Sequence, residues 1–173
     1  MTRIYLFSIA FALLCSGVFA RPAGQIPQGA ALGELVLTGL NTPDKKLSTY
    51  RGKPLIINVW ASWCGPCRQE MPSLERMAWS DKASKWTVIG ISTDDHVVAA
   101  KGFLRQANAT LNHYIDKELQ AEAMLGADRL PLTVVVDSQG RVRNRWYGAK
   151  EWDSPQAVQW IEASLKDPLS VRK

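Results

Sequence analysis

The stretch that decides the fold of this chain is Leu55-Ile-Ile-Asn-Val-Trp-Ala-Ser-Trp-Cys-Gly-Pro-Cys67. Its first six residues form a short run that is mostly apolar and rich in β-branched side chains, so they predict a buried strand. Residues 68–77 mix charged and apolar residues at helical spacing, and Pro66 suits the first turn of a helix. The pattern therefore predicts a strand that delivers Cys64 to the N-terminus of a helix.

The two cysteines of this stretch are placed for redox chemistry. At a helix N-terminus, free N–H groups and the helix dipole favour a thiolate. A thiolate is the attacking species of disulfide exchange, and such a site can lower a cysteine pKa well below its free value of about 8.5. Cys67, one turn into the helix, is placed to resolve the mixed disulfide that Cys64 would form. We therefore interpret Cys64 and Cys67 as a catalytic redox pair.

A C-x-x-C pair is also half of a structural zinc site, which needs a second pair of ligands. The only other cysteine, Cys15, lies near the N-terminus, and the two histidines, His96 and His113, are isolated from each other. The sequence therefore supplies no second ligand pair. We expect neither a metal site nor a cofactor.

Residues 58–72 carry a family resemblance. They read Asn58-Val-Trp-Ala-Ser-Trp-Cys-Gly-Pro-Cys-Arg-Gln-Glu-Met-Pro72, which resembles the active-site segment of thioredoxin-fold proteins and, in detail, the TlpA/ResA-like branch of bacterial extracytoplasmic thiol–disulfide oxidoreductases. The likeness extends more loosely over residues 32–165. It implies an α/β thioredoxin fold, a central mixed sheet flanked by helices, with an N-terminal β-hairpin and a central helix–strand insertion.

The remaining pattern agrees with this plan. An N-terminal hairpin is expected with arms at 34–37 and 46–50 around the turn at 41–44. Further strands are expected at 86–92, 113–116, 132–136 and 141–146, and helices at 94–107, 117–125 and 154–166. Thr93 is the expected N-cap of the helix at 94–107, with two aspartates at the positive end of its dipole. Gly126 is expected to end the helix at 117–125.

The two ends of the chain are expected to lie outside the domain. Arg3 precedes an uncharged apolar stretch that ends Val18-Phe19-Ala20, which predicts a secretory signal peptide over residues 1–20. An uncleaved membrane anchor is the competing interpretation, because the stretch is at the short limit for a spanning helix of about 20 residues. Residues 21–31 predict a flexible lead-in, residues 32–166 the thioredoxin-like domain and residues 167–173 a tail. The expected location is periplasmic or otherwise extracytoplasmic, where disulfides persist.

The resemblance implies a substrate-binding element at Leu130 and Pro131. It implies that Pro131 is cis and packs against the cysteine pair, and that the backbone of Leu130 pairs with an extended substrate segment. A trans proline that simply starts a strand is the plain alternative. We expect Trp63 to lie beside the site and shield Cys67, with a half-exposed loop aromatic as the alternative. Trp152 is assigned no role.

Glu70 is the third expected catalytic residue. It lies three residues after Cys67, on the same side of the helix, and a half-buried carboxylate near a thiol can raise the thiol pKa and shuttle its proton. The resemblance implies that Glu70 tunes the thiols; a solvated charge on the helix is the alternative. Gly65, Pro66 and Asn58 are expected to support the site. Because Asn58 stands where plain thioredoxin carries a buried aspartate, proton transfer is expected to use Glu70 or water.

The leading functional hypothesis is an extracytoplasmic dithiol reductase that acts on the disulfides of partner proteins. Thioredoxin also has Gly-Pro between its cysteines, and it differs from the oxidant DsbA by about 150 mV. The intervening pair is one determinant of that gap and favours reduction. The resemblance implies protein substrates such as apocytochrome c and a membrane electron donor of DsbD or CcdA type. The alternatives are a disulfide oxidase or isomerase and, from another class, a Cu(I)-handling module.

The net charge of +5 and the pI near 9.2 permit attraction to acidic partners or anionic lipid. The chain shows no interleaving of aromatic and basic residues of the kind that nucleic-acid-binding proteins carry, so nucleic acid is not an expected partner.

Overall fold

The computed structural model describes residues 24–166, apart from the side chains of residues 82 and 83. The predicted leader at 1–20 and the predicted tail at 167–173 lie outside the described residues. Within the described range, the structure has no helix with the length and apolar character needed to cross a membrane.

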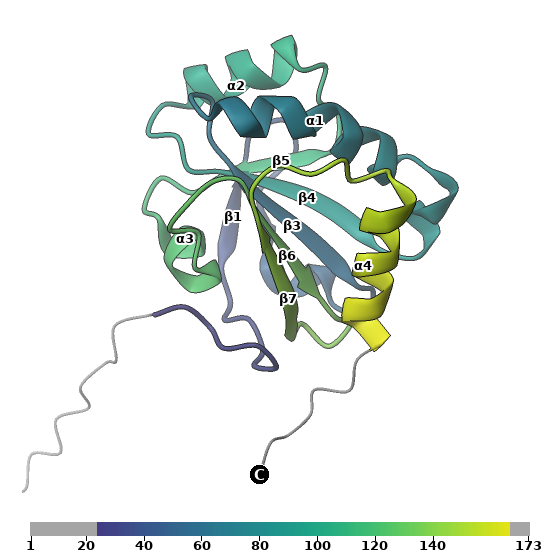
Figure 1. The fold of residues 1–173 in the computed structure, drawn as a ribbon. Helices are drawn as coiled ribbons and strands as arrows, with labels where there is room; N and C mark the ends of the chain where they lie inside the picture. The colour runs from purple at the N-terminus through teal and green to yellow at the C-terminus, as the bar shows by residue number, and fades with distance from the viewer. Residues whose placement is uncertain (1–23, 167–173) are drawn as a thin grey trace, which may run out of the picture.

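The core of the molecule is a seven-stranded mixed sheet in the order β2-β1-β5-β4-β3-β6-β7 (Figure 1). The central strand β3 (Leu55–Trp60) is parallel to β4 (Thr87–Ser92) and antiparallel to β6 (Leu132–Val136). Beyond β4, the parallel strand β5 (Asn112–Ile115) pairs with the antiparallel β1 (Val36–Gly39), and the short β2 (Lys45–Lys46) follows. On the other side, β7 (Val142–Tyr147) is antiparallel to β6. This arrangement confirms the predicted thioredoxin fold.

Helices cover both faces of this sheet (Figure 1). Buried residues of α1 (Gly65–Ala78), α2 (Val97–Gln106) and α4 (Pro155–Lys166) share one apolar cluster, and those of α3 (Gln120–Leu125) and the 3-10 turn η1 (Leu47–Tyr50) share another. A second 3-10 turn, η2 (Asp81–Ser84), follows α1. Along β3, Ile56 and Trp60 belong to the first cluster and Ile57 and Val59 to the second, as the two-residue period of a strand requires. The central strand is therefore buried on both faces.

The second arm of the N-terminal hairpin is mostly not a strand. Only residues 45–46 pair with β1, and the chain then forms the 3-10 turn η1. Leu47 and Tyr50 are its buried residues, and a spacing of three puts both on one side of a 3-10 turn, whereas a strand would turn them to opposite faces. Burial of these two side chains therefore selects the turn.

The predicted helix at 94–107 begins later than expected, at Val97, so the prediction of Thr93 as its N-cap is wrong. His96 occupies the N-cap without a side-chain hydrogen bond. Asp94 lies before the helix and accepts hydrogen bonds from Ser62 and Ser92 instead, which keeps the chain out of the helix at this point. The helix predicted at 117–125 likewise starts at residue 120, and it ends as predicted at Gly126, which has a φ of 76°.

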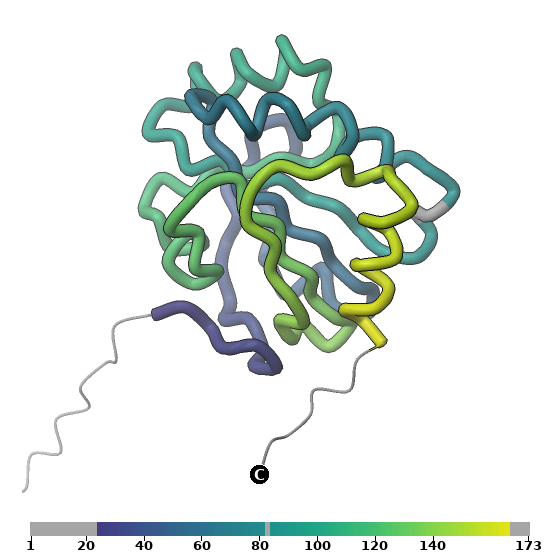
Figure 2. The backbone as a smooth tube through the Cα atoms, viewed as in Figure 1, coloured from purple at the N-terminus to yellow at the C-terminus, as the bar shows by residue number. Residues whose placement is uncertain are grey.

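The described part of the lead-in contacts helix α3 and then the edge strand β7. The backbone N–H of Ile26 donates to the Met124 carbonyl, and that of Gly29 donates to the Val142 carbonyl. Figure 2 shows this purple segment and the yellow end of α4 below the sheet, on the side away from α1 and α2. Both ends of the described chain therefore lie away from the start of α1.

Candidate active site

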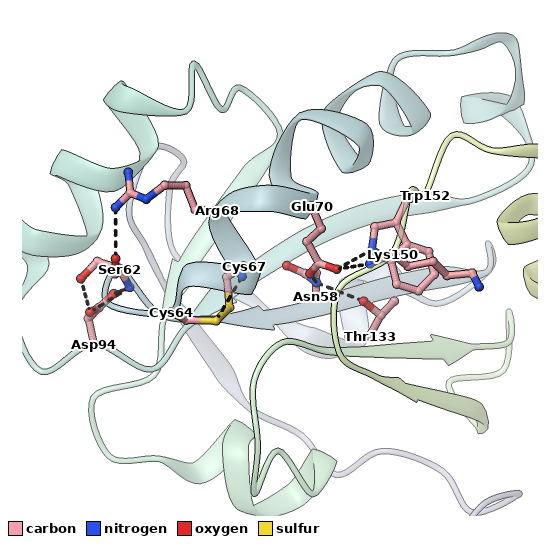
Figure 3. Close-up of a disulfide and its surroundings, with 10 residues drawn as sticks. All are labelled: Asn58, Ser62, Cys64, Cys67, Arg68, Glu70, Asp94, Thr133, Lys150 and Trp152. Atoms are coloured by element: carbon pink, nitrogen blue, oxygen red, sulfur yellow. Dashed lines mark hydrogen bonds between the residues drawn. A yellow bond between two sulfur atoms is a disulfide. The ribbon is translucent and has the colours of Figure 1, made fainter.

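Cys64 and Cys67 form a disulfide at the start of α1, with an S–S distance of 2.01 Å (Figure 3). Cys64 is the N-cap of the helix, and its Sγ accepts a hydrogen bond from the Cys67 N–H at 3.1 Å. Cys64 keeps 4% of its surface exposed, whereas Cys67 is fully buried. Of the two cysteines, Cys64 is therefore the one that keeps some exposed surface.

The two residues between the cysteines begin the helix. Pro66 occupies the first turn, where its missing N–H has no intrahelical partner to lose. A Cβ added to Gly65 would meet no atom within 4 Å. The space around residue 65 therefore does not itself require a glycine.

The loop that leads from β3 to Cys64 is held by a buried carboxylate, Asp94. One carboxyl oxygen of Asp94 accepts from the Ser62 hydroxyl at 2.6 Å, and the other accepts from the Ser62 N–H at 2.9 Å and the Ser92 hydroxyl at 2.7 Å. Figure 3 shows Ser62 and Asp94 on one side of the disulfide. This contact joins the loop to the end of β4, and the sequence analysis missed it.

Glu70 lies on the other side of the disulfide and is 1% exposed. Its Oε1 accepts from the Asn58 amide at 2.7 Å, and its Oε2 accepts from the Trp152 indole N–H at 2.9 Å and the Lys150 backbone N–H at 3.2 Å (Figure 3). The alternative of a solvated charge on the helix surface is therefore wrong. Glu70 is a buried carboxyl group, and each of its two oxygens accepts at least one hydrogen bond.

Burial raises the pKa of Glu70 from its ordinary value of 4.5 to about 7, although hydrogen bonds from Trp152, Asn58 and the Lys150 backbone act in the opposite direction. Desolvation disfavours a carboxylate, and N–H donors favour it. At a pKa of about 7 the group can both take up and release a proton near neutral pH, which is the property that proton transfer needs.

Asn58 on β3 contacts Glu70, and it also contacts β6; its support of the site remains a prediction. Its amide nitrogen donates to the Thr133 hydroxyl at 3.0 Å, and the two residues are direct partners in the β3–β6 pairing. Among the described residues, its Oδ1 has no hydrogen-bond partner. Thr133 was missed in the sequence analysis, although a single polar residue inside an apolar strand is a recognisable feature.

The peptide bond between Leu130 and Pro131 is cis, which confirms that prediction. Leu132 pairs with Val59, so Pro131 lies at the end of the sheet where β3 leads to Cys64. Leu130 packs partly buried against both apolar clusters, one of which includes Cys64. Binding of a substrate segment by Leu130 and Pro131 remains a prediction.

Trp63 is 73% exposed. A side chain with that much free surface is closer to the alternative, a half-exposed loop aromatic, than to a cover over Cys67. Contact of Trp63 with a substrate remains a prediction. Among residues 24–166, no three His, Cys, Asp or Glu side chains gather into a group that could hold a metal ion.

Trp152 is the main site residue that the sequence analysis missed. It is fully buried and lies 82 residues from Glu70 in the sequence. Its backbone N–H donates to the Ser73 hydroxyl at 3.0 Å, which attaches the loop before α4 to α1. No local pattern marks a contact over this separation.

Comparison with known proteins places these features in a family. The profile of the AhpC/TSA family matches residues 29–145, more than half of the chain. The chain is 28% identical to thiol-disulfide oxidoreductase ResA of Geobacillus kaustophilus over 115 residues, 66% of each protein. It is 26% identical to ResA of Bacillus anthracis over 169 residues, 93% of this chain and 94% of the relative.

A solved structure agrees with these sequence matches. A Chlorobium tepidum protein assigned as thiol:disulfide interchange protein DsbE superposes with a TM-score of 0.73 at 29% identity, over 81% of this chain and 99% of that one. The disulfide at the start of α1 is the C-x-x-C pair of a thiol–disulfide oxidoreductase of ResA/DsbE type. The chain belongs to the AhpC/TSA family.

Proposed function

We propose that this protein is an extracytoplasmic dithiol reductase that reduces disulfides of partner proteins. The observation that carries the proposal is the Cys64–Cys67 disulfide at the N-terminus of α1, in which Cys64 is the N-cap and keeps 4% of its surface exposed while Cys67 is fully buried. Free N–H groups at this end of a helix favour a thiolate on the N-cap cysteine once the pair is reduced.

The proposed reaction has two steps. The Cys64 thiolate attacks one sulfur of the substrate disulfide, and the other substrate sulfur leaves as a thiolate that takes up a proton. Cys67, once deprotonated, attacks Cys64 Sγ and releases the second substrate sulfur, which is also protonated. Two electrons and two protons thereby pass to the substrate, and the protein returns to the disulfide state seen in the structure.

Glu70 is the proposed acceptor of the Cys67 proton. It lies one helical turn after Cys67 on α1, and its pKa of about 7 lets it hold that proton transiently at neutral pH. Direct contact or one intervening water would carry the transfer. Asn58 cannot replace it, because an amide does not titrate in this range.

The direction of the reaction is proposed from Gly65 and Pro66, the pair that thioredoxin also has. The reduction potential, measured by equilibration with glutathione or dithiothreitol, tests it. We expect a value near that of thioredoxin, about −270 mV. A value above about −180 mV, the range of protein disulfide isomerase and DsbA, would instead assign oxidase or isomerase activity.

Location and partners extend the proposal. The leader predicted at residues 1–20 would export the domain from the cytoplasm. In the extracytoplasmic compartment, apocytochrome c or another disulfide-bearing protein is the proposed substrate, and a membrane protein of DsbD or CcdA type is the proposed electron donor. The described chain begins on the side away from α1 (Figure 2), so a segment that tethers the N-terminus would not need to cover the start of α1.

Trapping of partners tests the whole proposal. A Cys67→Ser variant cannot release a mixed disulfide, so it should accumulate covalent adducts that dithiothreitol dissolves. The matched variant Cys64→Ser loses one thiol as well but lacks the accessible nucleophile, and it should form few adducts. Equal adduct formation by the two variants, or none by Cys67→Ser, would contradict the assignment of Cys64 as nucleophile.

A further inference from the structure

The two oxygens of the Glu70 carboxyl group have chemically different partners. Oε2 receives the Trp152 indole N–H and the Lys150 backbone N–H, and neither group can accept a hydrogen bond. Oε1 receives only the Asn58 amide, which has an acceptor oxygen as well as an N–H₂ group. A proton on Oε2 would point at two N–H donors that cannot accept it. A proton on Oε1 would point at the Asn58 amide, which can rotate to present its acceptor oxygen.

We propose that Trp152 is a positioning residue of the thiol–disulfide site: its indole N–H keeps Oε2 of Glu70 as an acceptor, so that Glu70 takes up its proton on Oε1, beside Asn58. This inference rests on the proposed function, in which Glu70 receives the Cys67 proton. It adds a residue from the loop between β7 and α4 to a site built on β3 and α1 (Figure 3).

Asn58 can serve both protonation states of Glu70. With the carboxylate, its N–H₂ group donates to Oε1 and to the Thr133 hydroxyl, and its Oδ1 has no partner among the described residues. A half-turn of the amide brings Oδ1 to the same place, where it accepts from the protonated Oε1 and from the Thr133 hydroxyl. The group left without a partner then becomes the N–H₂, so the number of hydrogen bonds at this position is kept.

Trp152 is itself held rigidly. Its backbone N–H donates to the Ser73 hydroxyl, whose single proton lies within hydrogen-bond distance of the Glu70 backbone carbonyl at 2.8 Å and of the Lys150 carbonyl at 3.2 Å. On the outside, the Arg76 guanidinium binds the Asp153 carboxylate at 2.6 Å. The loop is thus attached to α1 on both sides of the indole, which keeps the N–H directed at Glu70.

Charged groups on the elements around Glu70 have partners of their own. The Lys150 ammonium lies 3.8 Å from the centre of the Trp146 ring, and Arg76 pairs with Asp153 and Glu151. The strands β3 and β6 present the neutral side chains Asn58 and Thr133, and α1 presents the two cysteines. Neutral N–H donors, with Trp152 prominent among them, therefore stabilise the carboxylate.

The test compares Trp152→Phe with Trp146→Phe. Both changes keep an aromatic ring and remove an indole N–H, but the Trp146 Nε1 has no hydrogen-bond partner among the described residues. The pH midpoint of Glu70 titration is measured by NMR from the ¹³C signal of its labelled carboxyl group. This signal is assigned by its absence from the spectrum of Glu70→Gln. Loss of a donor to a charged acceptor should raise the midpoint in Trp152→Phe by about one pH unit, a tenfold change in proton affinity. Trp146→Phe should match the wild type, and equal midpoints in the two variants would overturn the inference.

The pH profile of disulfide exchange gives a separate reading. We expect the profile of Trp152→Phe to move with the Glu70 midpoint, and this movement should vanish when Glu70→Gln is also present. A shifted midpoint with an unmoved profile would overturn the positioning role in exchange. A wild-type protein that exchanges no disulfide at any pH would refute the proposed function, while the NMR comparison would still test the contact.

A second variant covers the case in which Trp152→Phe does not fold. Ser73→Ala keeps the indole but removes the hydroxyl that holds the Trp152 backbone. The midpoint of Glu70 should rise in this variant as well, by less than in Trp152→Phe. An unchanged midpoint in Ser73→Ala would contradict the part of the inference that depends on the rigid loop.

Discussion

Replacement of Glu70 by Gln should abolish a pH-dependent loss of stability in the disulfide form of the protein. Burial raises the pKa of Glu70 from 4.5 to about 7, so the folded state holds the proton more tightly than the unfolded state does. The stabilisation from this proton is complete below pH 4.5 and is lost as the pH rises through 7. Gln carries no proton to lose.

The size of the effect follows from the shift. A rise from 4.5 to about 7, at 1.36 kcal/mol for each pH unit, corresponds to about 3 kcal/mol. The wild-type free energy of unfolding, minus that of Glu70→Gln, should fall by this amount between pH 4.5 and pH 8. Any constant cost of placing Gln opposite the Trp152 N–H cancels in the pH dependence of the difference.

Urea unfolding of the oxidised proteins at several pH values measures this difference. Glu118→Gln makes the same chemical change at an exposed position and should follow the wild type throughout. If Glu70→Gln also follows the wild type from pH 4.5 to 8, Glu70 ionises normally in the folded protein. The proposed role as proton acceptor for Cys67 would then lose its basis.

Two further predictions concern other buried titratable groups. Asp94→Asn should lower the free energy of unfolding by about 2 kcal/mol, because a carboxylate that accepts three hydrogen bonds from serines is lost. Urea unfolding measures this loss. The control is Asp95→Asn at the exposed neighbouring position, which should leave the free energy of unfolding almost unchanged. Burial lowers the pKa of His113, against the influence of the nearby Glu75 carboxylate. The unfolded chain therefore takes up this proton first, and stability should be lost as the pH falls below about 6.5. His113→Gln should lose less stability than the wild type between pH 7 and 5, whereas an identical loss would contradict burial of a neutral imidazole.

Local pattern was sufficient for the scaffold of the site. The strand predicted at residues 55–60 is the observed β3, because a short β-branched run with one polar interruption can satisfy its backbone and side chains only between two sheet faces. The helix after it begins at Gly65, next to the predicted first-turn proline. The position of Cys64 at a helix N-terminus was therefore predictable from neighbours in the sequence alone.

Contacts between distant segments were not predictable in this way. The Glu70–Trp152 contact depends on the path of the chain between β7 and α4, and nothing near Trp152 in the sequence indicates a buried acceptor for its indole N–H. Thr133 is an intermediate case. Asn58 and Thr133 are polar residues within two apolar strands, and pairing these strands so that the two polar side chains meet gives the observed register.

The disulfide lies between two buried carboxyl groups, those of Asp94 and Glu70 (Figure 3). Their hydrogen-bond partners differ, and this difference predicts a different role for each. Asp94 accepts from two serine hydroxyls and one backbone N–H, so its oxygens are occupied as acceptors and it holds the loop before Cys64. Glu70 has one oxygen occupied by N–H donors and the other beside an amide that can turn. A proton on Oε1 of Glu70 therefore needs only a turn of the Asn58 amide, whereas the contacts of Asp94 hold Ser62 and the loop before Cys64. Under the proposed function, Glu70 and not Asp94 is therefore the carboxyl group that exchanges a proton with Cys67.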